Sequence, residues 1–180
     1  RIYVKAIDIA GNETADNIVT ITIDTTTPTS YISYPEDGKF YPSVSSVIGT
    51  SSDPNENGSR VNRVRVWVYD VTETKYFNFE TNLWQSEETY KDVEYAPAQP
   101  LSYSIDLQAV SWQEPHQYRI YIKSRDRALK SNDPTYTGNW QAGTDGIAGA
   151  TVVEFKIDRT TPTAAITLPD PTIPEYYRNY

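Results

Sequence analysis

The chain has 180 residues, 22% charged and 38% hydrophobic, which is enough for one ordinary domain with flanking pieces or for two small domains. Its net charge of −8 argues against nucleic-acid binding, because phosphate contacts need a basic surface. It has no cysteine, which excludes disulfides and thiolate metal sites, and no apolar run reaches the roughly 18–20 residues of a membrane span.

Residues 1–24 predict a β-hairpin, because apolar residues alternate with polar ones on both sides of a turn at residues 8–12. The side chains expected to face a core are Ile2, Val4, Val19, Ile21 and Ile23. Two strands alone are marginally stable in water. We therefore expect this hairpin to be covered by a neighbouring repeat, either in the same chain or in an adjacent subunit of a filament.

The opening segment recurs later in the chain. Residues 1–10 (RIYVKAIDIA) return as 119–128 (RIYIKSRDRA), an offset of 118, and residues 23–29 (IDTTTPT) return as 157–163 (IDRTTPT), an offset of 134. The later copy thus holds 16 extra residues between the two phrases. Such self-similarity indicates a tandem array. It divides the chain into the last strands of a preceding repeat (1–27), a complete domain (28–161) and the start of a following repeat (162–180).

Residues 24–28 are expected to form a short junction, since Thr favours extended backbone and Pro28 cannot donate to a sheet. The clearest strand beyond it is 64–68, where Val64, Val66 and Val68 alternate with Arg65 and Trp67. Further strands are expected around residues 32–34, 44–50, 76–84, 103–107, 118–122 and 153–157, with an acidic, solvated segment at 86–94. About seven strands separated by turns predict an all-β fold, an antiparallel two-sheet sandwich.

The chain resembles the bacterial immunoglobulin-like (Ig-like) repeats that occur in tandem in large secreted and cell-surface proteins. The phrases that carry this resemblance are Ile48–Asp53 followed by the strand Val61–Val68, the hairpin Tyr76–Trp84, the turn Asp8–Asn12 and the repeated Ile-Asp-x-Thr-x-Pro junction. The second copy departs from the pattern, because residues 126–130 replace the turn and residues 132–149 form a long insertion. The resemblance implies an Ig-like sandwich that serves as a non-catalytic spacer, stalk or adhesion module, extracellular or on the cell surface.

Oxygen-rich turns near the junction suggest Ca²⁺ as a ligand, because hard cations prefer carboxylate and carbonyl oxygens. The candidate metal ligands are Asp8, Asn12, Asp24 and Asp37, and the loop residues Asp53, Asn55 and Asn57 form a separate cluster. The alternative is that these residues simply form turns, since Asp and Asn side chains bond to nearby backbone.

Aromatic residues suggest a platform for sugar rings or a contact surface for a protein ligand. Trp140 stands out because it lies in the 132–149 insertion and not on an alternating strand, and Trp84 and Tyr136 are the other ligand candidates. The alternative is packing in the core or across strands, which is the usual role of aromatic residues in a sandwich.

The sequence gives little support for catalysis. His116 is the only histidine and no Gly-x-Ser-x-Gly elbow is present. Glu87, Glu88, Asp92 and Glu94 could include a carboxylate pair of the glycosidase kind, but clustered acids more often form a solvated face. We therefore predict no enzyme activity and no resident cofactor.

Overall fold

The computed structural model describes residues 1–54, 60–128 and 138–165, and in these ranges the chain is almost entirely strand and loop. The strands are β1 (Ile2–Val4), β2 (Asn17–Val19), β3 (Thr29–Tyr34), β4 (Lys39–Tyr41), β5 (Ser46–Ser52), β6 (Val61–Asp70), β7 (Lys75–Asn78), β8 (Leu83–Gln85), β9 (Lys91–Ala98), β10 (Leu101–Asp106), β11 (Gln117–Asp126) and β12 (Thr151–Ile157), with a 3₁₀ turn η1 (Gln141–Gly143). The prediction of an all-β fold is confirmed. No helix in the described ranges is long and apolar enough to cross a membrane.

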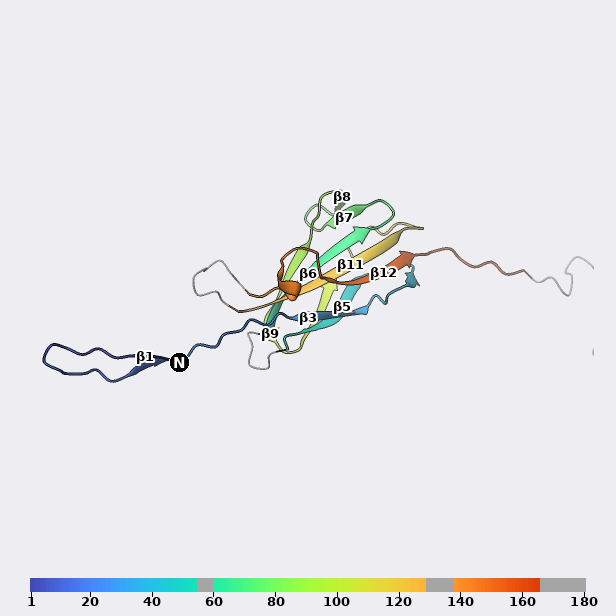
Figure 1. The fold of residues 1–180 in the computed structure, drawn as a ribbon. Coiled ribbons are helices and arrows are strands. Elements are labelled where there is room, and N and C mark those ends of the chain that lie inside the picture. The colour runs from blue at the N-terminus through green and yellow to red at the C-terminus, as the bar shows by residue number, and fades with distance from the viewer. Residues whose placement is uncertain (55–59, 129–137, 166–180) are drawn as a thin grey trace, which may run out of the picture.

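Strands β3 to β12 form a sandwich-like body of two sheets (Figure 1). The smaller sheet has the order β10-β5-β3, and the larger has the order β4-β12-β11-β6-β7-β8, with β9 also paired to β6. All strand pairs in the body are antiparallel except β4 with β12, which is parallel. The purely antiparallel sandwich expected from the sequence is therefore wrong at this one edge.

The core lies between the sheets and follows from the alternation of side chains. In β6 the side chains of Val64, Val66 and Val68 point inward and are fully buried. Next to β6 in the same sheet, β11 adds Tyr118, Ile120 and Ile122, and β10 of the smaller sheet supplies Tyr103 and Ile105 from the opposite side of the core. Each fully buried Val or Ile stabilises the fold by about 1.5–3 kcal/mol relative to exposure.

The outer face of β6 is also covered, which the sequence did not lead us to expect. Residues 86–94 were predicted to be solvated, but β9 begins within them at Lys91 and pairs with β6. Glu88 accepts a hydrogen bond from Trp67 Nε1 at 3.0 Å, and Asp92 binds Arg65. The acidic segment is thus partly ordered, because the carboxylates of Glu88 and Asp92 bind side chains of β6 and residues from Lys91 onward pair with that strand.

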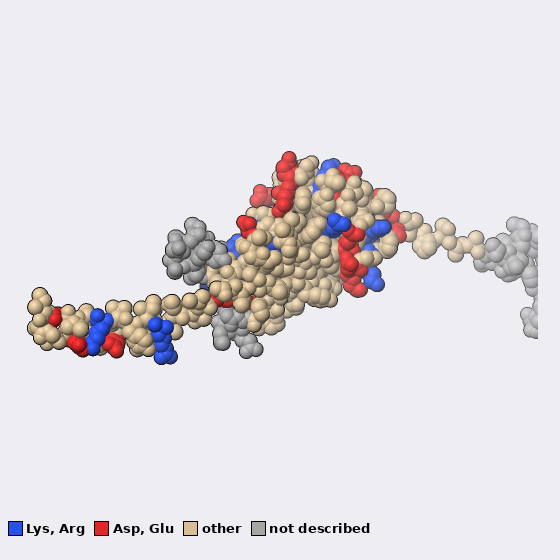
Figure 2. All heavy atoms as spheres, in the orientation of Figure 1, with Lys and Arg blue, Asp and Glu red and all other residues tan. Residues whose placement is uncertain are grey.

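The hairpin β1–β2 extends away from the body at the end where β3 begins (Figure 1). The five apolar side chains predicted to face a core are exposed, from 49% for Val19 to 76% for Ile23. The other chain end leaves the body from the opposite side, after β12. Figure 2 shows charged side chains of both signs along the hairpin, whereas the middle of this face of the body is mostly uncharged.

Candidate functional site

The candidate site lies where residues 24–28 enter the body, and its centre is a group of three carboxylates. One carboxylate oxygen from each of Asp24, Asp53 and Asp126 lies within 4.8 Å of the other two. Asp53 and Asp126 are buried, at 1% and 0% exposure, and Asp24 is half-buried. Three strand ends bring them together, because Asp24 precedes β3, Asp53 follows β5 and Asp126 ends β11.

Thr26 ties the incoming chain to this group. Its amide donates to Asp24 Oδ1 at 3.1 Å, and its hydroxyl lies 2.6 Å from Asp24 Oδ1 and 2.9 Å from Asp53 Oδ1. A hydroxyl carries one proton, so the proton of Thr26 lies between two carboxylates. Hydrogen bonds with a charged partner are stronger than neutral ones. Thr26 therefore fixes the conformation of the junction and its attachment to the body.

Asn139, which lies in the 132–149 insertion, completes the site by binding Asp126. Its amide nitrogen donates to Asp126 Oδ1 at 2.6 Å and its side-chain Nδ2 donates to Asp126 Oδ2 at 2.9 Å. The amide of Asp126 donates in turn to the carbonyl of Asn139 at 3.1 Å. Nδ2 of Asn139 also lies 3.3 Å from the carbonyl oxygen of Asp24. We call the bonds between Asp126 and Asn139 the Asp–Asn clasp.

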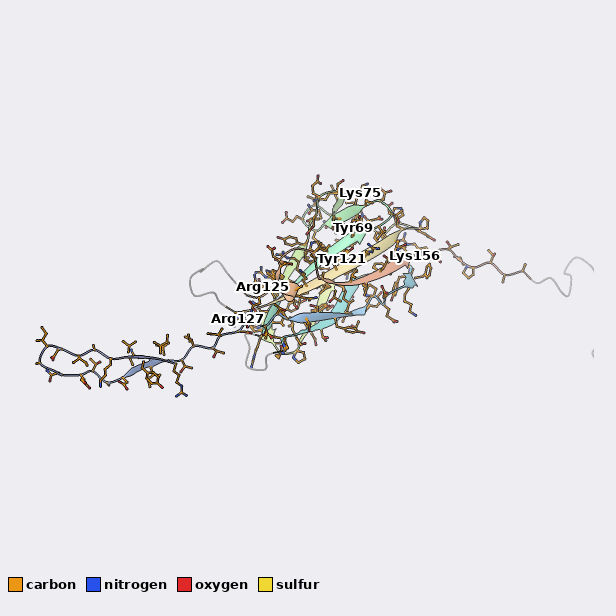
Figure 3. All side chains as sticks on the ribbon, viewed as in Figure 1. Tyr69, Lys75, Tyr121, Arg125, Arg127 and Lys156 are labelled. Atoms are coloured by element: carbon orange, nitrogen blue, oxygen red, sulfur yellow. The ribbon has the colours of Figure 1, made fainter. Side chains whose placement is uncertain are left out.

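Gly138 allows the loop to approach the clasp closely. Its φ of +127° lies in the region that favours glycine, and a Cβ at this position would collide with the carbonyl oxygen of Asp126. Arg125 and Arg127 lie at the same end of the body (Figure 3).

The same clasp occurs in the hairpin. The amide and Nδ2 of Asn12 donate to Oδ1 and Oδ2 of Asp8, both at 2.8 Å, and the amide of Asp8 donates to the carbonyl of Asn12 at 3.0 Å. These bonds lower the pKa of Asp8, chiefly through the Asn12 side chain. Asp8 corresponds to Asp126 at the repeat offset of 118. Asn139 takes the place of Asn12 despite the longer loop.

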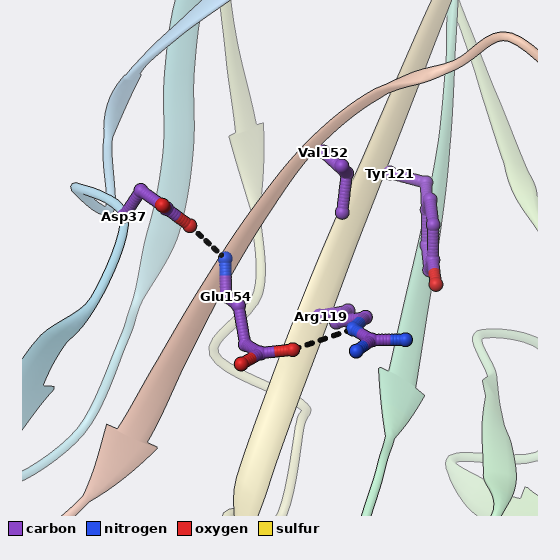
Figure 4. A pocket seen from close by; sticks show the side chains of 5 residues that line it. All are labelled: Asp37, Arg119, Tyr121, Val152 and Glu154. Carbon is purple, nitrogen blue, oxygen red and sulfur yellow. Dashed lines mark hydrogen bonds and ion pairs between the residues drawn. The ribbon is translucent and has the colours of Figure 1, made fainter.

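The four predicted metal ligands do not converge on one point. Asp24 is in the carboxylate group, whereas Asp8 and Asn12 are in the exposed turn of the hairpin. Asp37 lies elsewhere, in a shallow pocket with Arg119, Tyr121, Val152 and Glu154 (Figure 4). There its Oδ1 accepts the amide of Glu154 at 2.8 Å, and Glu154 binds Arg119.

The residues that could hold a cation are Asp24, Asp53 and Asp126, since carboxylate oxygens suit Ca²⁺. Donors already occupy much of this group, because Thr26 binds two of the carboxylates and Asn139 binds the third at both oxygens. Ca²⁺ binding stays a prediction. Asn55 and Asn57 lie outside the described residues.

Trp140, the first of the predicted sugar-binding residues, makes cation–π contacts with two arginines. The guanidinium carbons of Arg65 and Arg125 lie 4.4 and 5.4 Å from its ring centroid. Arg65 also stacks on Tyr90 at 3.6 Å and binds Asp92 through two nitrogens, at 2.6 and 2.9 Å. The indole of Trp140 therefore covers the outer face of the larger sheet and supports buried cations.

The other predicted aromatic residues do not join Trp140. Trp84 packs against Phe77 and Tyr118, which belong to the core on the inner side of the sheet, and its Nε1 lies 3.3 Å from Ser111 Oγ. It thus lies on the opposite side of the larger sheet from Trp140. Tyr136 is outside the described residues.

The groups weighed for catalysis also have structural partners. His116 Nδ1 lies 2.7 Å from Asp70 Oδ2, and the same carboxylate accepts the amides of Thr72 and Glu73 through Oδ1, so it orders the turn after β6. Glu94 pairs with Arg63. Among the described residues, Glu88, Asp92 and Glu94 bind an indole or a guanidinium and do not face one another as a bare acid pair.

Sequence reasoning missed three members of the site, namely Thr26, Asp126 and Asn139. The recurrence of Asp8 as Asp126 was the available signal for one of them. Comparison of the chain with protein-family models, with curated protein sequences and with solved structures found no match.

Proposed function

We propose that residues 28–161 form a non-catalytic spacer of Ig-like type, which sets distance and orientation between neighbouring parts of a large extracellular or cell-surface bacterial protein or filament. The observation that carries this proposal is that Thr26 and Asn139 join the incoming linker, residues 24–27, to the body by hydrogen bonds. We call a linker held in this way a seated linker. A spacer needs one, because a linker without fixed bonds lets neighbouring domains tumble independently.

The outgoing chain is seated in a similar way at the opposite end of the body. The amide of Asp158 donates to the carbonyl of Tyr41 at 3.0 Å, and Arg159 donates to the carbonyls of Pro42 and Trp112 at 2.9 and 3.1 Å. Thr160 repeats the turn seen at Thr26, since its amide donates to Asp158 Oδ1 at 2.8 Å. Both linkers therefore leave the body along defined directions.

Glycan recognition, the competing function, is less well supported by these contacts. A sugar ring stacked on Trp140 would have to displace Arg65 or Arg125, both of which are less than 10% exposed. Removing a partner from a buried cation is costly. The same contacts explain Trp140 as a structural residue.

The proposal is tested by the backbone order of the incoming linker in the full chain. Measured by ¹⁵N relaxation, the amide order parameter of Thr26 should be close to the value of about 0.85 typical of rigid backbone. Asn139→Ala combined with Thr26→Ala should lower the order parameters of residues 24–27 toward about 0.6. Thr25→Ala, at an exposed neighbouring position, is the matched control and should change nothing. Low order parameters in the wild type would contradict a seated linker.

A further inference from the structure

The hairpin β1–β2 has the same pairing register as β11–β12. Ile2, Tyr3 and Val4 pair with Val19, Ile18 and Asn17, and Ile120, Tyr121 and Ile122 pair with Val153, Val152 and Thr151. Each position of the first set maps onto the second at the offsets of 118 and 134 found in the sequence. Together with the shared Asp–Asn clasp, this register makes the hairpin a second copy of the β11–β12 ribbon.

The two copies differ in what covers them. In the body, β11 pairs with β6 on one side, and β12 pairs with β4 on the other. Ile120 and Ile122 are fully buried there, and Ile157 is 1% exposed. Their equivalents in the hairpin, Ile2, Val4 and Ile23, are 50%, 57% and 76% exposed. Equivalent apolar side chains thus lie in a core in one copy and in water in the other.

The pairing of β1 with β2 is shorter than that of β11 with β12. In the body, Phe155 and Lys156 pair with Tyr118 and Gln117. Ile21 and Thr22 are the equivalents of Phe155 and Lys156, but residues 1–24 contain no counterpart of Tyr118 or Gln117. Residues 20–23 accordingly lie outside β2.

We propose that the hairpin of residues 1–24 is the closing ribbon of a second sandwich, and that its partner is a segment with the pattern of residues 24–118. This segment supplies a β6-like strand with inward valines beside β1, a β4-like strand beside β2, and a three-stranded sheet over the apolar face. The inference goes beyond the spacer role and does not depend on it. It also gives Asp8 and Asn12 a place, since they would meet the equivalents of Asp24 and Asp53 in that segment.

A second copy of the intact body does not fit as the partner. Its β6 already pairs with β11, and its β4 and β11 already flank β12, so neither edge that the hairpin needs is available. The required surface exists only in a segment whose own β11–β12 position is empty.

The test is to supply that segment. Residues 24–118 are placed directly ahead of Arg1 in the full 180-residue chain, so that Tyr118 is followed by Arg1 as it is by Arg119. Amide hydrogen exchange of residues 2–4 and 17–23 should then be slowed by at least about 100-fold relative to the unextended chain, because these amides would open only with unfolding of a domain. Ile2→Asp, at the position equivalent to buried Ile120, should abolish this protection.

Tyr3→Ala is the matched control, because the equivalent Tyr121 points to the outer face and lines the open pocket. It should leave most of the protection in place. Fast exchange of residues 2–4 and 17–23 in the extended chain, while residues 28–157 remain protected, would overturn the proposal. Protection of the hairpin in the unextended chain that grows with protein concentration would also overturn it, because a second copy would then be the partner.

Discussion

Arg65 shows how a charged side chain can be part of the structure of a β-sheet. It is 7% exposed, on the outer face of β6, and its charge is matched by the two-point contact with Asp92. Burial works against the charged form, but the hydrogen bond to Asp92 and the charge of that carboxylate outweigh it, so the pKa of Arg65 is raised. Tyr90 and Trp140 cover its two sides. In the sequence Arg65 alternates with buried valines, a pattern that indicates an exposed side chain, but in the structure its side chain is packed.

Tyr118 is expected to make stability fall at alkaline pH. Burial is the main cause that raises its pKa to about 12 from 10.0. Between these two values the unfolded chain loses the phenolic proton while the folded chain keeps it, so the free energy of unfolding decreases as pH rises from 10 to 12. Below pH 9 both states hold the proton and the residue adds no pH dependence.

Urea unfolding at a series of pH values measures this effect. From pH 9 to 12 the Tyr118→Phe variant should lose about 2 kcal/mol less stability than the wild type, since one pKa unit corresponds to about 1.4 kcal/mol. At neutral pH it should be slightly less stable, because the amide of Gln113 donates to this hydroxyl at 2.8 Å. Parallel pH curves for the two proteins would show that Tyr118 is not buried as described.

At the level of residues, the sequence predicted part of the candidate site. Asp24 was singled out as an oxygen ligand beside the junction, and the structure places it in the carboxylate group. Asp8 and Asn12 were singled out with it because they are near in sequence, but they form a separate clasp within the hairpin. Asn139 could not be predicted, because nine extra residues separate it from Asp126 compared with the spacing of Asn12 from Asp8.

At the level of elements, the smaller sheet depends on a close contact at Gly49 in β5. A Cβ on this residue would collide with the carbonyl oxygen of Tyr31 in β3 and with the ring of Tyr103 in β10. The hydroxyl of Tyr103 donates to the same carbonyl at 2.8 Å, so the missing side chain makes room for a bond between the two outer strands of the sheet.

Gly49→Ala should therefore lower the free energy of unfolding by about 2–3 kcal/mol, because overpacking moves Tyr103 and breaks its hydrogen bond. Chemical denaturation measures this loss. Gly146→Ala is the matched control, since a Cβ there meets nothing within 4 Å, and it should change stability by less than about 0.5 kcal/mol. Equal stability of the two variants would contradict the contact at Gly49.

Strands with strong alternation were predictable from the sequence, whereas two short or acidic ones were not. The valines of β6 and the apolar positions of β10, β11 and β12 indicated both the strands and their buried faces. β4 was missed because it has three residues and pairs at the edge of the sheet. β9 was missed because its charges suggest a solvated segment, and no local pattern reveals Arg65 as the partner of Asp92.

At the scale of the whole molecule, the body carries a hydrogen-bonded linker at each end. The incoming linker is held at Thr26 and the outgoing linker at Arg159 and Thr160, on opposite sides of the body. Because the bonds at both ends are to side chains and carbonyls of the body, the span between the linkers should be a fixed property of one unit. A spacer role depends on that property.

The most direct test is the distance distribution between nitroxide labels on Thr22→Cys and Thr163→Cys, measured by double electron-electron resonance. The chain has no cysteine of its own, so only these exposed positions are labelled. We predict one narrow distribution, which broadens when Thr26→Ala and Asn139→Ala are added and stays narrow with Thr25→Ala. A broad distribution in the wild type, unchanged by the added substitutions, would contradict the claim that the unit sets the separation of its neighbours.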